Sequence, residues 1–341
     1  MVSRTDRSSP SPLPTALPSI LFMDVVGQDE AAVASLLAQP DRLAILLDSA
    51  RRTYSAPGLV LADGLSKRWA RRAGGPYAGA VEAVAARMGR RGAYLLNYSH
   101  EWGCTAGVIE DPEQGGPRLV RTLDWPFDGL GRALIVTRWE GQAGPYISAT
   151  WPGFAGVLTG SAPGRFATSI NHPPLPSAWS RVIAWPEARA RVWQSRALPP
   201  SHLLRLAFDT CHTFDEAFAL LRTTPICIPA IYTLAGTQAG EALVIERMQT
   251  AAFIPAQPFA ANHWASQPGP EGQPRNASSI GRRAAMESLT PSWTLDWLCR
   301  PILQPDTRLV FMATPAHGRF AVQGWEKTGA VTKVLNGTDA A

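Results

Sequence analysis

The sequence changes character at Gly92, and this change constrains the fold more than any other feature of the chain. Before Gly92, apolar residues recur with the 3.6-residue period of amphipathic helices. After it, short apolar runs are separated by Gly, Pro and Asp, at the spacing of antiparallel strands. The sequence therefore predicts a helical N-terminal part followed by a part dominated by β-sheet.

Four helices are predicted before Gly92. The first follows Asp29, the second begins at Asp41, and the other two cover Leu59–Arg72 and Pro76–Arg90. The start of the chain differs, because residues 1–19 are rich in Ser and Pro and lack apolar periodicity. We therefore divide the chain into a mobile leader at 1–27, a helical N-terminal segment at 28–103 and a sheet-rich domain at 104–341.

The sheet-rich part contains two groups of strands with a pair of helices between them. Strands are predicted at Cys104–Glu110, Arg118–Trp125, Ala133–Trp139, Tyr146–Trp151, Phe166–Ile170, Ile231–Ala235, Ala242–Arg247, Ala251–Ile254, Phe259–Asn262 and, as the last, Leu309–Ala313; helices are predicted at Ser201–Thr210, at Phe214–Arg222 and from Ser279. This order is expected if two antiparallel sheets pack face to face with helices outside them. The predicted fold class is therefore α+β.

Cysteine usage and hydropathy limit the remaining choices. The chain of 341 residues is long enough to bury a large core without disulfides. Its four cysteines are far apart and form no zinc-binding spacing, so neither a disulfide framework nor a structural metal is indicated. No apolar run approaches the roughly 20 residues that span a bilayer. A cytoplasmic location is predicted.

The net charge of +5 comes almost entirely from arginine. A nucleic-acid-binding protein is expected to gather such charge on one stripe with aromatic residues between, whereas here it is mostly dispersed, so no nucleic-acid partner is predicted. The exception is a basic cluster opposed only by Glu82, and it consists of Lys67, Arg68, Arg71, Arg72, Arg87, Arg90 and Arg91. One interpretation is a solvated helical face, and the other is contact with an anionic membrane surface or amphiphile.

The candidate chemistry centres on Cys104, which begins a strand directly after Gly103. A strong turn signal at residues 111–117 predicts a hairpin with the next strand. If the hairpin closes near Gln114, the numbers of paired residues sum to about 228, which places Asp124 opposite Cys104. Arg121 then points to the other face of the hairpin unless the strand is bulged.

A cysteine nucleophile needs a base, and no histidine of this chain has an obvious claim to that role. Cleavage of the Gly103–Cys104 bond would supply one, because the new α-amino group would have a pKa of about 7.7–8.0. This amine can take the thiol proton and return it to a leaving amine. Asp124 would orient the ammonium, and a nearby arginine would stabilise the thiolate. The alternative for Cys104 is a buried small apolar residue, the role predicted for Cys211, Cys227 and Cys299.

Several segments around these residues resemble one known family in order and spacing. They are residues 95–105 (LLNYSHEWGCT), residues 121–127 (RTLDWPF), residues 151–160 (WPGFAGVLTG), Ser169–Asn171, Ala261–Trp264 and the pair Arg282 and Arg283. Together they resemble the acid ceramidase and N-acylethanolamine acid amidase branch of the N-terminal nucleophile (Ntn) hydrolases, which is related to the choloylglycine hydrolases. The resemblance covers roughly residues 55–320.

The resemblance implies a four-layer αββα sandwich, cleavage of a proenzyme before its nucleophile, and hydrolysis of a linear amide that joins an acyl chain to an amine. It makes residues 104–341 the catalytic domain and implies a small-molecule N-acyl amide as partner, with no cofactor. Motif matching makes Cys104 the nucleophile and places Arg121 and Asp124 beside it. It also gives Asn262 the role of oxyanion donor, Asn171 the place of an active-site asparagine and Arg282 that of a second arginine, which Arg283 would take with a one-residue shift.

The sequence departs from the family at some positions. His172 stands where ceramidase-type enzymes carry Glu, and Thr122 replaces a common Asn. Two alternatives remain open: an acyltransferase that uses an amine or β-lactam acceptor, and a non-catalytic homologue that binds amphiphiles. Four tryptophans within the motifs either pack in the core or line a site for an acyl chain, and they are Trp102, Trp125, Trp151 and Trp264.

Overall fold

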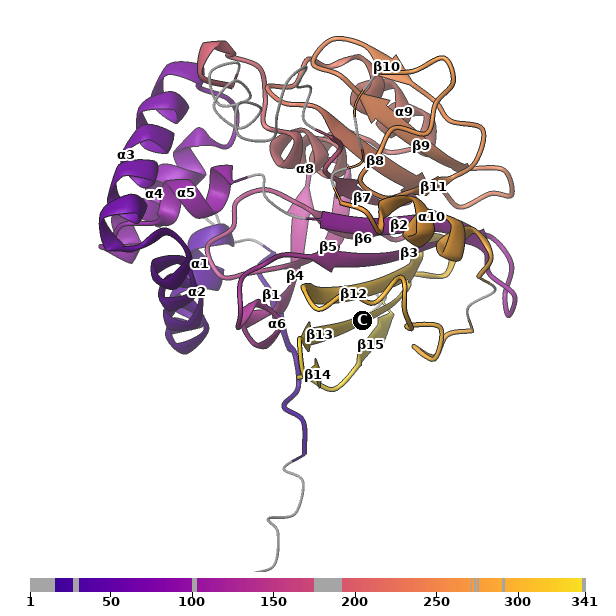
Figure 1. Ribbon diagram of the computed structural model, residues 1–341, viewed down its shortest axis with the longest axis horizontal. Helices are drawn as coiled ribbons and strands as arrows, with labels where there is room; N and C mark the ends of the chain where they lie inside the picture. The colour runs from indigo at the N-terminus through magenta and orange to yellow at the C-terminus, as the bar shows by residue number, and fades with distance from the viewer. Residues whose placement is uncertain are drawn as a thin grey trace, which may run out of the picture.

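The computed structural model describes residues 16–338 except 27–30, 100–102, 175–191, 271, 273, 275, 290 and 291. The N-terminal part contains five described helices, which Figure 1 shows gathered on one side of the sheets: α1 (Ala31–Leu37), α2 (Pro40–Tyr54), α3 (Ala56–Ala73), α4 (Ala78–Met88) and α5 (Ala93–Tyr98). The first four match the predicted helices. Helix α5 was not predicted, because six residues are too few to display a helical period.

One sheet has eight strands in the order β1-β4-β5-β6-β7-β8-β9-β10. Their bounds are β1 (Leu21–Asp24), β4 (Ile135–Gly141), β5 (Gly144–Thr150), β6 (Thr159–Ala162), β7 (Phe166–Asn171), β8 (Ala230–Ala235), β9 (Ala242–Arg247) and β10 (Ala252–Phe253). The second sheet has seven strands, ordered β11-β2-β3-β12-β13-β14 with β15 also paired to β13. Its strands are β2 (Gly103–Glu110), β3 (Pro117–Asp124), β11 (Phe259–Ala260), β12 (Thr307–Thr314), β13 (Arg319–Glu326), β14 (Gly329–Ala330) and β15 (Leu335–Thr338).

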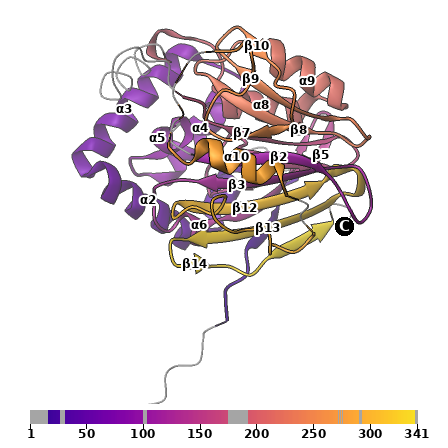
Figure 2. The same cartoon turned by 45° about the vertical axis from the view of Figure 1, so that its right-hand side comes forward.

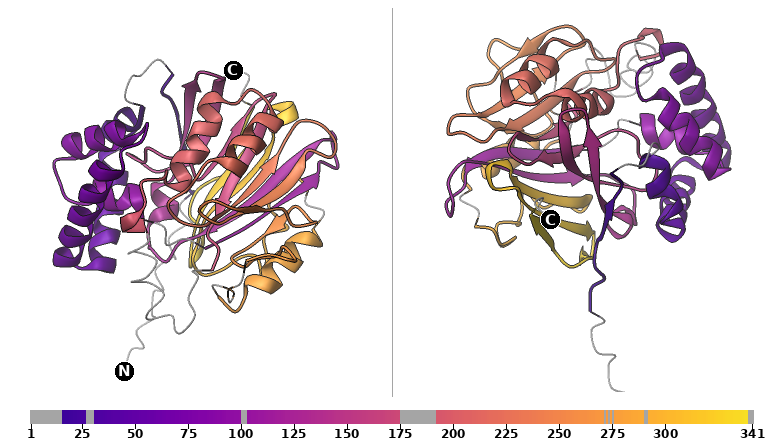
Figure 3. Two further views of the ribbon diagram at one scale, coloured as in Figure 1. Left: turned by 90° about the horizontal axis from the view of Figure 1, so that it is seen from above. Right: turned by 180° about the vertical axis from the view of Figure 1, so that it is seen from behind.

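The two sheets face each other, and helices cover their outer faces (Figure 2, Figure 3). Helices α8 (Pro200–Thr210) and α9 (Phe214–Thr223) pack on the eight-stranded sheet. Helix α10 (Ser279–Glu287) packs on β2 and β11, and the short α6 (Leu130–Ala133) packs on β13. The predicted α+β class with a four-layer αββα arrangement is confirmed.

Three parts of the sheets differ from the prediction. Strand β1 pairs parallel to β4, with Leu21 opposite Ile135, although every strand was expected to be antiparallel and residues 21–24 were assigned to a mobile leader. Strands β13 to β15 follow β12, which was predicted to be the last strand, and β6 was not predicted. The reason is composition: Arg319–Glu326 mixes polar and apolar residues, and Thr159–Ala162 is small and polar, so neither forms an apolar run.

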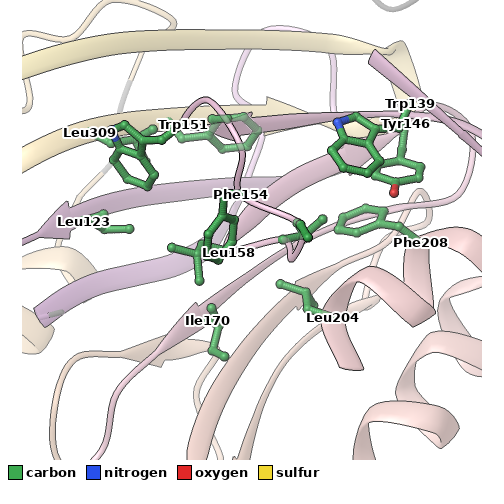
Figure 4. Packing of buried hydrophobic residues seen from close by; sticks show 14 of the residues in the cluster. Leu123, Trp139, Tyr146, Trp151, Phe154, Leu158, Ile170, Leu204, Phe208 and Leu309 are labelled. Atoms are coloured by element: carbon green, nitrogen blue, oxygen red, sulfur yellow. The ribbon is translucent and has the colours of Figure 1, made fainter. Parts of the chain in front are cut away.

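The main core lies between the sheets and under α8. Figure 4 shows side chains from both sheets meeting there, with Leu123 and Leu309 from one sheet and Ile170 from the other. Tyr146 and Phe166 each stack on Phe208 of α8, at ring-centroid distances of 4.9 and 5.1 Å. Burying each such side chain contributes about 1.5–3 kcal/mol, so the sandwich is a stable frame for the residues near its middle.

Polar contacts join the helical segment to α8 and to loops of the sheet-rich part. Trp69 donates from Nε1 to the carbonyl of Val192 at 2.7 Å, and Tyr77 donates from its hydroxyl to Asp209 of α8 at 2.6 Å. Asn97 accepts the backbone N–H of Ala155 at 2.7 Å.

None of the helices in the described ranges is both long enough and apolar enough to cross a bilayer.

Candidate active site

The β2–β3 hairpin sets the position of the candidate nucleophile. Gly103 pairs with Asp124, Cys104 with Leu123, and Ala106 with Arg121. The register differs by one residue from the predicted one, in which Asp124 was opposite Cys104. Because side chains alternate between faces, this shift puts Arg121 on the same face as Cys104 and removes the expected obstacle to their contact.

The Cys104 side chain is fully buried and touches Arg121. Nη2 of Arg121 donates to Sγ of Cys104 at 2.9 Å and to the carbonyl of Ile170 at 2.8 Å. The Cys104 thiol faces the same carbonyl, at 3.6 Å. Nη1 of Arg121 bonds the carbonyl of Leu158 and the hydroxyl of Thr159, so strands β6 and β7 hold the guanidinium in place.

Burial and the arginine act on the thiol in opposite directions. Burial raises the pKa of Cys104, while the charge and hydrogen bond of Arg121 lower it, and the burial effect is larger. The thiol is therefore protonated at neutral pH in this uncleaved form and needs a base to become a nucleophile.

Asp124 lies at the end of β3 and pairs with Arg282 of α10. Nη1 of Arg282 is 3.2 Å from Oδ2 of Asp124, and the hydroxyl of Thr307 donates to Oδ1 at 2.8 Å. Burial raises the pKa of Asp124, and Arg282 and Thr307 oppose that shift. Removing one partner of such a buried pair leaves an uncompensated charge, so each group requires the other.

Arg282 connects the helix to the backbone around the nucleophile. Nη1 donates to the carbonyl of Cys104 at 2.8 Å and to the hydroxyl of Thr105 at 2.7 Å, and Nη2 donates to Oδ1 of Asn262 at 2.8 Å. Arg283 instead donates to the carbonyl of Phe259. Of the two arginines left open by the motif match, the structure brings Arg282 to Cys104.

Asn262 follows β11, and its side chain and backbone N–H are hydrogen-bonded. Its Oδ1 accepts the backbone N–H of Cys104 at 3.0 Å, and its Nδ2 donates to the carbonyl of His172 at 2.6 Å. Its backbone N–H donates to the hydroxyl of Ser279 at 2.8 Å. An amide nitrogen carries two protons, so one N–H of Asn262 remains for a ligand.

Asn171 ends β7 next to Ile170, and its Nδ2 donates to the carbonyl of Ala261 at 3.3 Å. Its Oδ1 is buried and has no hydrogen-bond partner within the described part of the chain. The structure thus gathers Cys104, Arg121, Asp124 and Arg282 into one network with Asn262 and places Asn171 at its border.

Sequence reasoning missed the residues that support this network. Thr105, Thr307, Ser279 and Asn276 all bond to one of the predicted residues. Of these, only Thr307 could have been found from strand pairing, because it lies opposite Asp124 in β12. It was missed because β12 was predicted to begin at Leu309, two residues too late.

The tryptophans and cysteines that the sequence analysis singled out lie in different surroundings. Trp125 and Trp151 meet edge to face at 5.6 Å, and both border a small cavity lined by α1, α2 and α4. Trp264 packs on Ile231 and Val244 in a separate cluster, and Trp102 lies outside the described residues. Cys211 and Cys227 are buried as expected, but Cys299 is exposed, so its prediction as a core residue is wrong.

Comparisons with known proteins give matches over parts of the chain. Residues 182–296 match the family model described as acyl-coenzyme A:6-aminopenicillanic acid acyl-transferase. The chain is 27% identical over 202 residues to an N-acylethanolamine-hydrolyzing acid amidase of Oryctolagus cuniculus, which covers 54% of this chain and 53% of that protein. It is 30% identical over 103 residues to an acid ceramidase of Pan troglodytes, covering 30% of this chain and 25% of that protein.

The chain spans about half the length of the N-acylethanolamine-hydrolyzing acid amidases to which it is similar. Among solved structures, it is similar to an N-acylethanolamine-hydrolyzing acid amidase ortholog of Caenorhabditis elegans. That similarity has a TM-score of 0.48 and 20% identity, over 62% of this chain and 93% of the other.

Proposed function

We propose, from its resemblance to the acid amidase and acid ceramidase branch of the Ntn hydrolases, that this chain is a self-processing cysteine amidase of N-acyl amides. The relatives confirm the resemblance that the motifs predicted. Their names describe amide hydrolases, which supports an amidase-type activity for this chain. Self-processing, the nucleophile and the substrate are the parts that we propose.

The first step is cleavage of the chain at its own nucleophile. The thiol of Cys104 attacks the carbonyl carbon of Gly103, the Gly103–Cys104 C–N bond breaks, and the thiol proton passes to the new amine. Water then hydrolyses the thioester, which leaves a carboxylate on Gly103 and a free thiol and amine on Cys104. The 2.9 Å contact of Arg121 with Sγ supports this step, because a guanidinium stabilises the developing thiolate.

The second step is turnover of the amide substrate. The α-amine of Cys104 takes the thiol proton, Sγ attacks the acyl carbonyl, and the second N–H of Asn262 donates to the oxyanion. The amine product leaves with the proton from the ammonium, and an acyl thioester remains on Cys104. Water, activated by the same amine, then releases the acyl chain as a carboxylic acid.

Asp124 and Arg282 have a supporting role. Arg282 holds the carbonyl of Cys104 and the side chain of Asn262 at the same time, at 2.8 Å each. Asp124 balances its charge in a buried setting. The pair therefore fixes the nucleophile and the oxyanion donor relative to each other, which is the preorganisation that acyl transfer requires.

The observation that carries the proposal is the contact of a fully buried thiol with a guanidinium, next to an amide side chain that bonds its backbone N–H. Mass spectrometry of the purified protein tests it. We expect fragments that end at Gly103 and begin at Cys104, and a Cys104→Ala variant that stays intact. An intact wild-type chain with full amidase activity contradicts the mechanism.

The substrate is tested with a panel of N-acyl amides. N-acylethanolamines, ceramides, bile-salt conjugates, acyl homoserine lactones and penicillin V differ in acyl chain and amine but share the amide bond. We expect turnover of at least one long-chain member by the cleaved protein and none by Cys104→Ala.

A second candidate function is acyl transfer to an amine. The match of residues 182–296 to an acyl-transferase family model favours it. The thioester on Cys104 would then react with an amine instead of water. Adding a competing small amine to the reaction distinguishes the two, because an acyltransferase yields the new amide in place of the free acid.

A further inference from the structure

A cavity of about 700 Å³ lies in the helical N-terminal segment, and it shares no lining residue with the network around Cys104. Its walls come from one face of α3, the second half of α4, the start of α5 and Arg51 of α2. Figure 1 shows these helices together at the edge of the molecule, away from the sheets.

Part of the lining of this cavity is apolar. Leu59 and Val60 line it from α3, and Ala85 and Ala86 line it from α4. Val60 is 50% exposed, so part of this apolar lining is open to solvent.

Four cations line the same cavity: Arg51, Lys67, Arg90 and Arg91. Asp63 accepts the backbone N–H groups of Tyr94 and Leu95 at 2.9 and 3.1 Å and keeps its charge. Glu82 pairs with Arg71 at 2.8 Å and Arg51 pairs with Asp48 at 3.4 Å, and neither Arg71 nor Asp48 lines the cavity. Lys67, Arg90 and Arg91 therefore face one carboxylate, that of Asp63, and leave an excess of positive charge.

Arg90 and Arg91 lie at the same end of the cavity as the apolar residues Leu59 and Val60. Helices α3 and α4 are joined by the short turn at residues 74–77, so the start of α3 and the end of α4 lie at the same end of this helical hairpin. Arg90 and Arg91 follow the end of α4, and Leu59 and Val60 lie in the first turns of α3. Cations after the end of a helix also favour its dipole, but the dipole accounts for neither the cavity nor the apolar wall.

We propose that this cavity binds an anionic amphiphile, with a single apolar chain along Leu59, Val60 and Ala86 and a carboxylate at Arg90 and Arg91. An arginine side chain binds a carboxylate with two parallel hydrogen bonds, and the chain buries apolar surface that is otherwise exposed. An uncharged lipid would leave the cations unused, and an inorganic anion would leave the apolar wall unused. The site is independent of the chemistry proposed for Cys104.

The test uses the full chain with the substitution Cys104→Ala, so that reaction at the thiol does not contribute. Isothermal titration with laurate and dodecyl phosphate below their critical micelle concentrations, and with dodecanol below its solubility limit, measures binding of the monomeric ligands. We expect saturable binding of laurate with one ligand per chain, and binding of dodecanol weaker by about tenfold or more. Dodecyl phosphate distinguishes a carboxylate site from one that accepts any anionic headgroup, and tighter binding of the phosphate than of laurate overturns the choice of carboxylate.

A matched pair of charge-reversal variants locates the site. Arg90→Glu/Arg91→Glu changes two cations that line the cavity, and Arg68→Glu/Arg87→Glu changes two cations of the same basic cluster that do not line it. We expect the first pair to weaken laurate binding by about tenfold or more and the second by less than about twofold. Equal losses from both pairs would mean diffuse attraction by the whole cluster, and the proposal would be wrong.

Two further measurements complete the test. Ala86→Trp fills the cavity from an exposed position and is expected to abolish laurate binding without lowering the melting temperature. Sedimentation with vesicles of anionic phospholipid examines the membrane-surface interpretation of the cluster. Vesicle binding without any binding of monomeric laurate would replace the cavity by a membrane contact and overturn the proposal.

Discussion

Arg121 Nη2 lies 2.9 Å from Cys104 Sγ. The two residues are on adjacent strands but are not directly opposite each other, since Arg121 is two positions before Leu123, the residue that pairs with Cys104. Ala106, the residue directly opposite Arg121, has a side chain too small to block this diagonal. The contact is therefore a product of the register, and it can be tested through the ionisation of the thiol.

Replacing Arg121 by Gln is expected to raise the pKa of Cys104, because the arginine charge and hydrogen bond both lower it. The pH profile of thiol alkylation in the cleaved protein should shift toward alkaline pH, and kcat should fall by about 10²–10³. Arg121→Lys keeps the charge, so its alkylation profile and kcat should lie between those of the wild type and of Arg121→Gln. A profile that does not move would show that Arg121 acts only in packing.

Asp124 provides a prediction for the dependence of stability on pH. Its pKa is raised by burial, so the folded protein binds this proton more tightly than the unfolded chain does. The contribution of this group to stability is then largest at low pH and falls as pH rises from the unfolded pKa of about 3.9 through the folded value.

The variant Asp124→Asn cannot titrate and should lack this contribution. The difference in unfolding free energy between wild type and variant, measured by urea titration from pH 3 to pH 7, is expected to change across that range. At pH 7 the variant also replaces the ion pair with Arg282 by a neutral contact. A pH-independent difference would show that Asp124 has an ordinary pKa.

Asn262→Ala is expected to lower kcat by about 10²–10³ while KM changes little, because an oxyanion donor acts mainly in the transition state. The same change removes the acceptor for the Cys104 backbone N–H, so cleavage of the chain should also slow. Mass spectrometry over time separates the two effects. A loss confined to KM would instead make Asn262 a substrate-binding residue.

Ser279 and His263 form a chain of contacts behind Asn262. The Ser279 hydroxyl accepts the backbone N–H of Asn262 at 2.8 Å and lies 2.8 Å from Nδ1 of His263. We expect Ser279→Ala to lower kcat about tenfold with KM unchanged, through loss of a positioning hydrogen bond.

His263→Asn supplies a matched control for that arrangement, since the side-chain oxygen of Asn can take the place of Nδ1. It should retain more activity than His263→Ala. If the two variants have equal kcat values, the contact with Ser279 has no part in positioning Asn262.

The prediction from sequence succeeded where apolar periodicity was strong and failed where structure depends on distant pairing. The strand Ala242–Arg247 has its predicted bounds, and the start of α10 at Ser279 is as predicted. Strand β1 was not recognised because a parallel partner more than a hundred residues away stabilises it. Short edge elements of this kind have no periodicity of their own.

The candidate residues were found by motif order, but their arrangement was not. A hairpin that closes one residue differently reverses which side chains share a face, and the sequence of the turn at residues 111–116 did not specify its register. The choice between Arg282 and Arg283 also depended on the orientation of α10, which the sequence did not specify. Consecutive residues of a helix point about 100° apart, and the Arg282 side chain is the one that bonds Cys104 of β2.

Strand β1 adds a consequence for the two pieces that a cut before Cys104 would create. The piece ending at Gly103 contributes an entire edge strand to the eight-stranded sheet, together with the side chains of Trp69 and Tyr77 that reach the other piece. Such a cut would yield one particle built from two polypeptides. Dilution alone should not separate them, and dissociation should coincide with global unfolding.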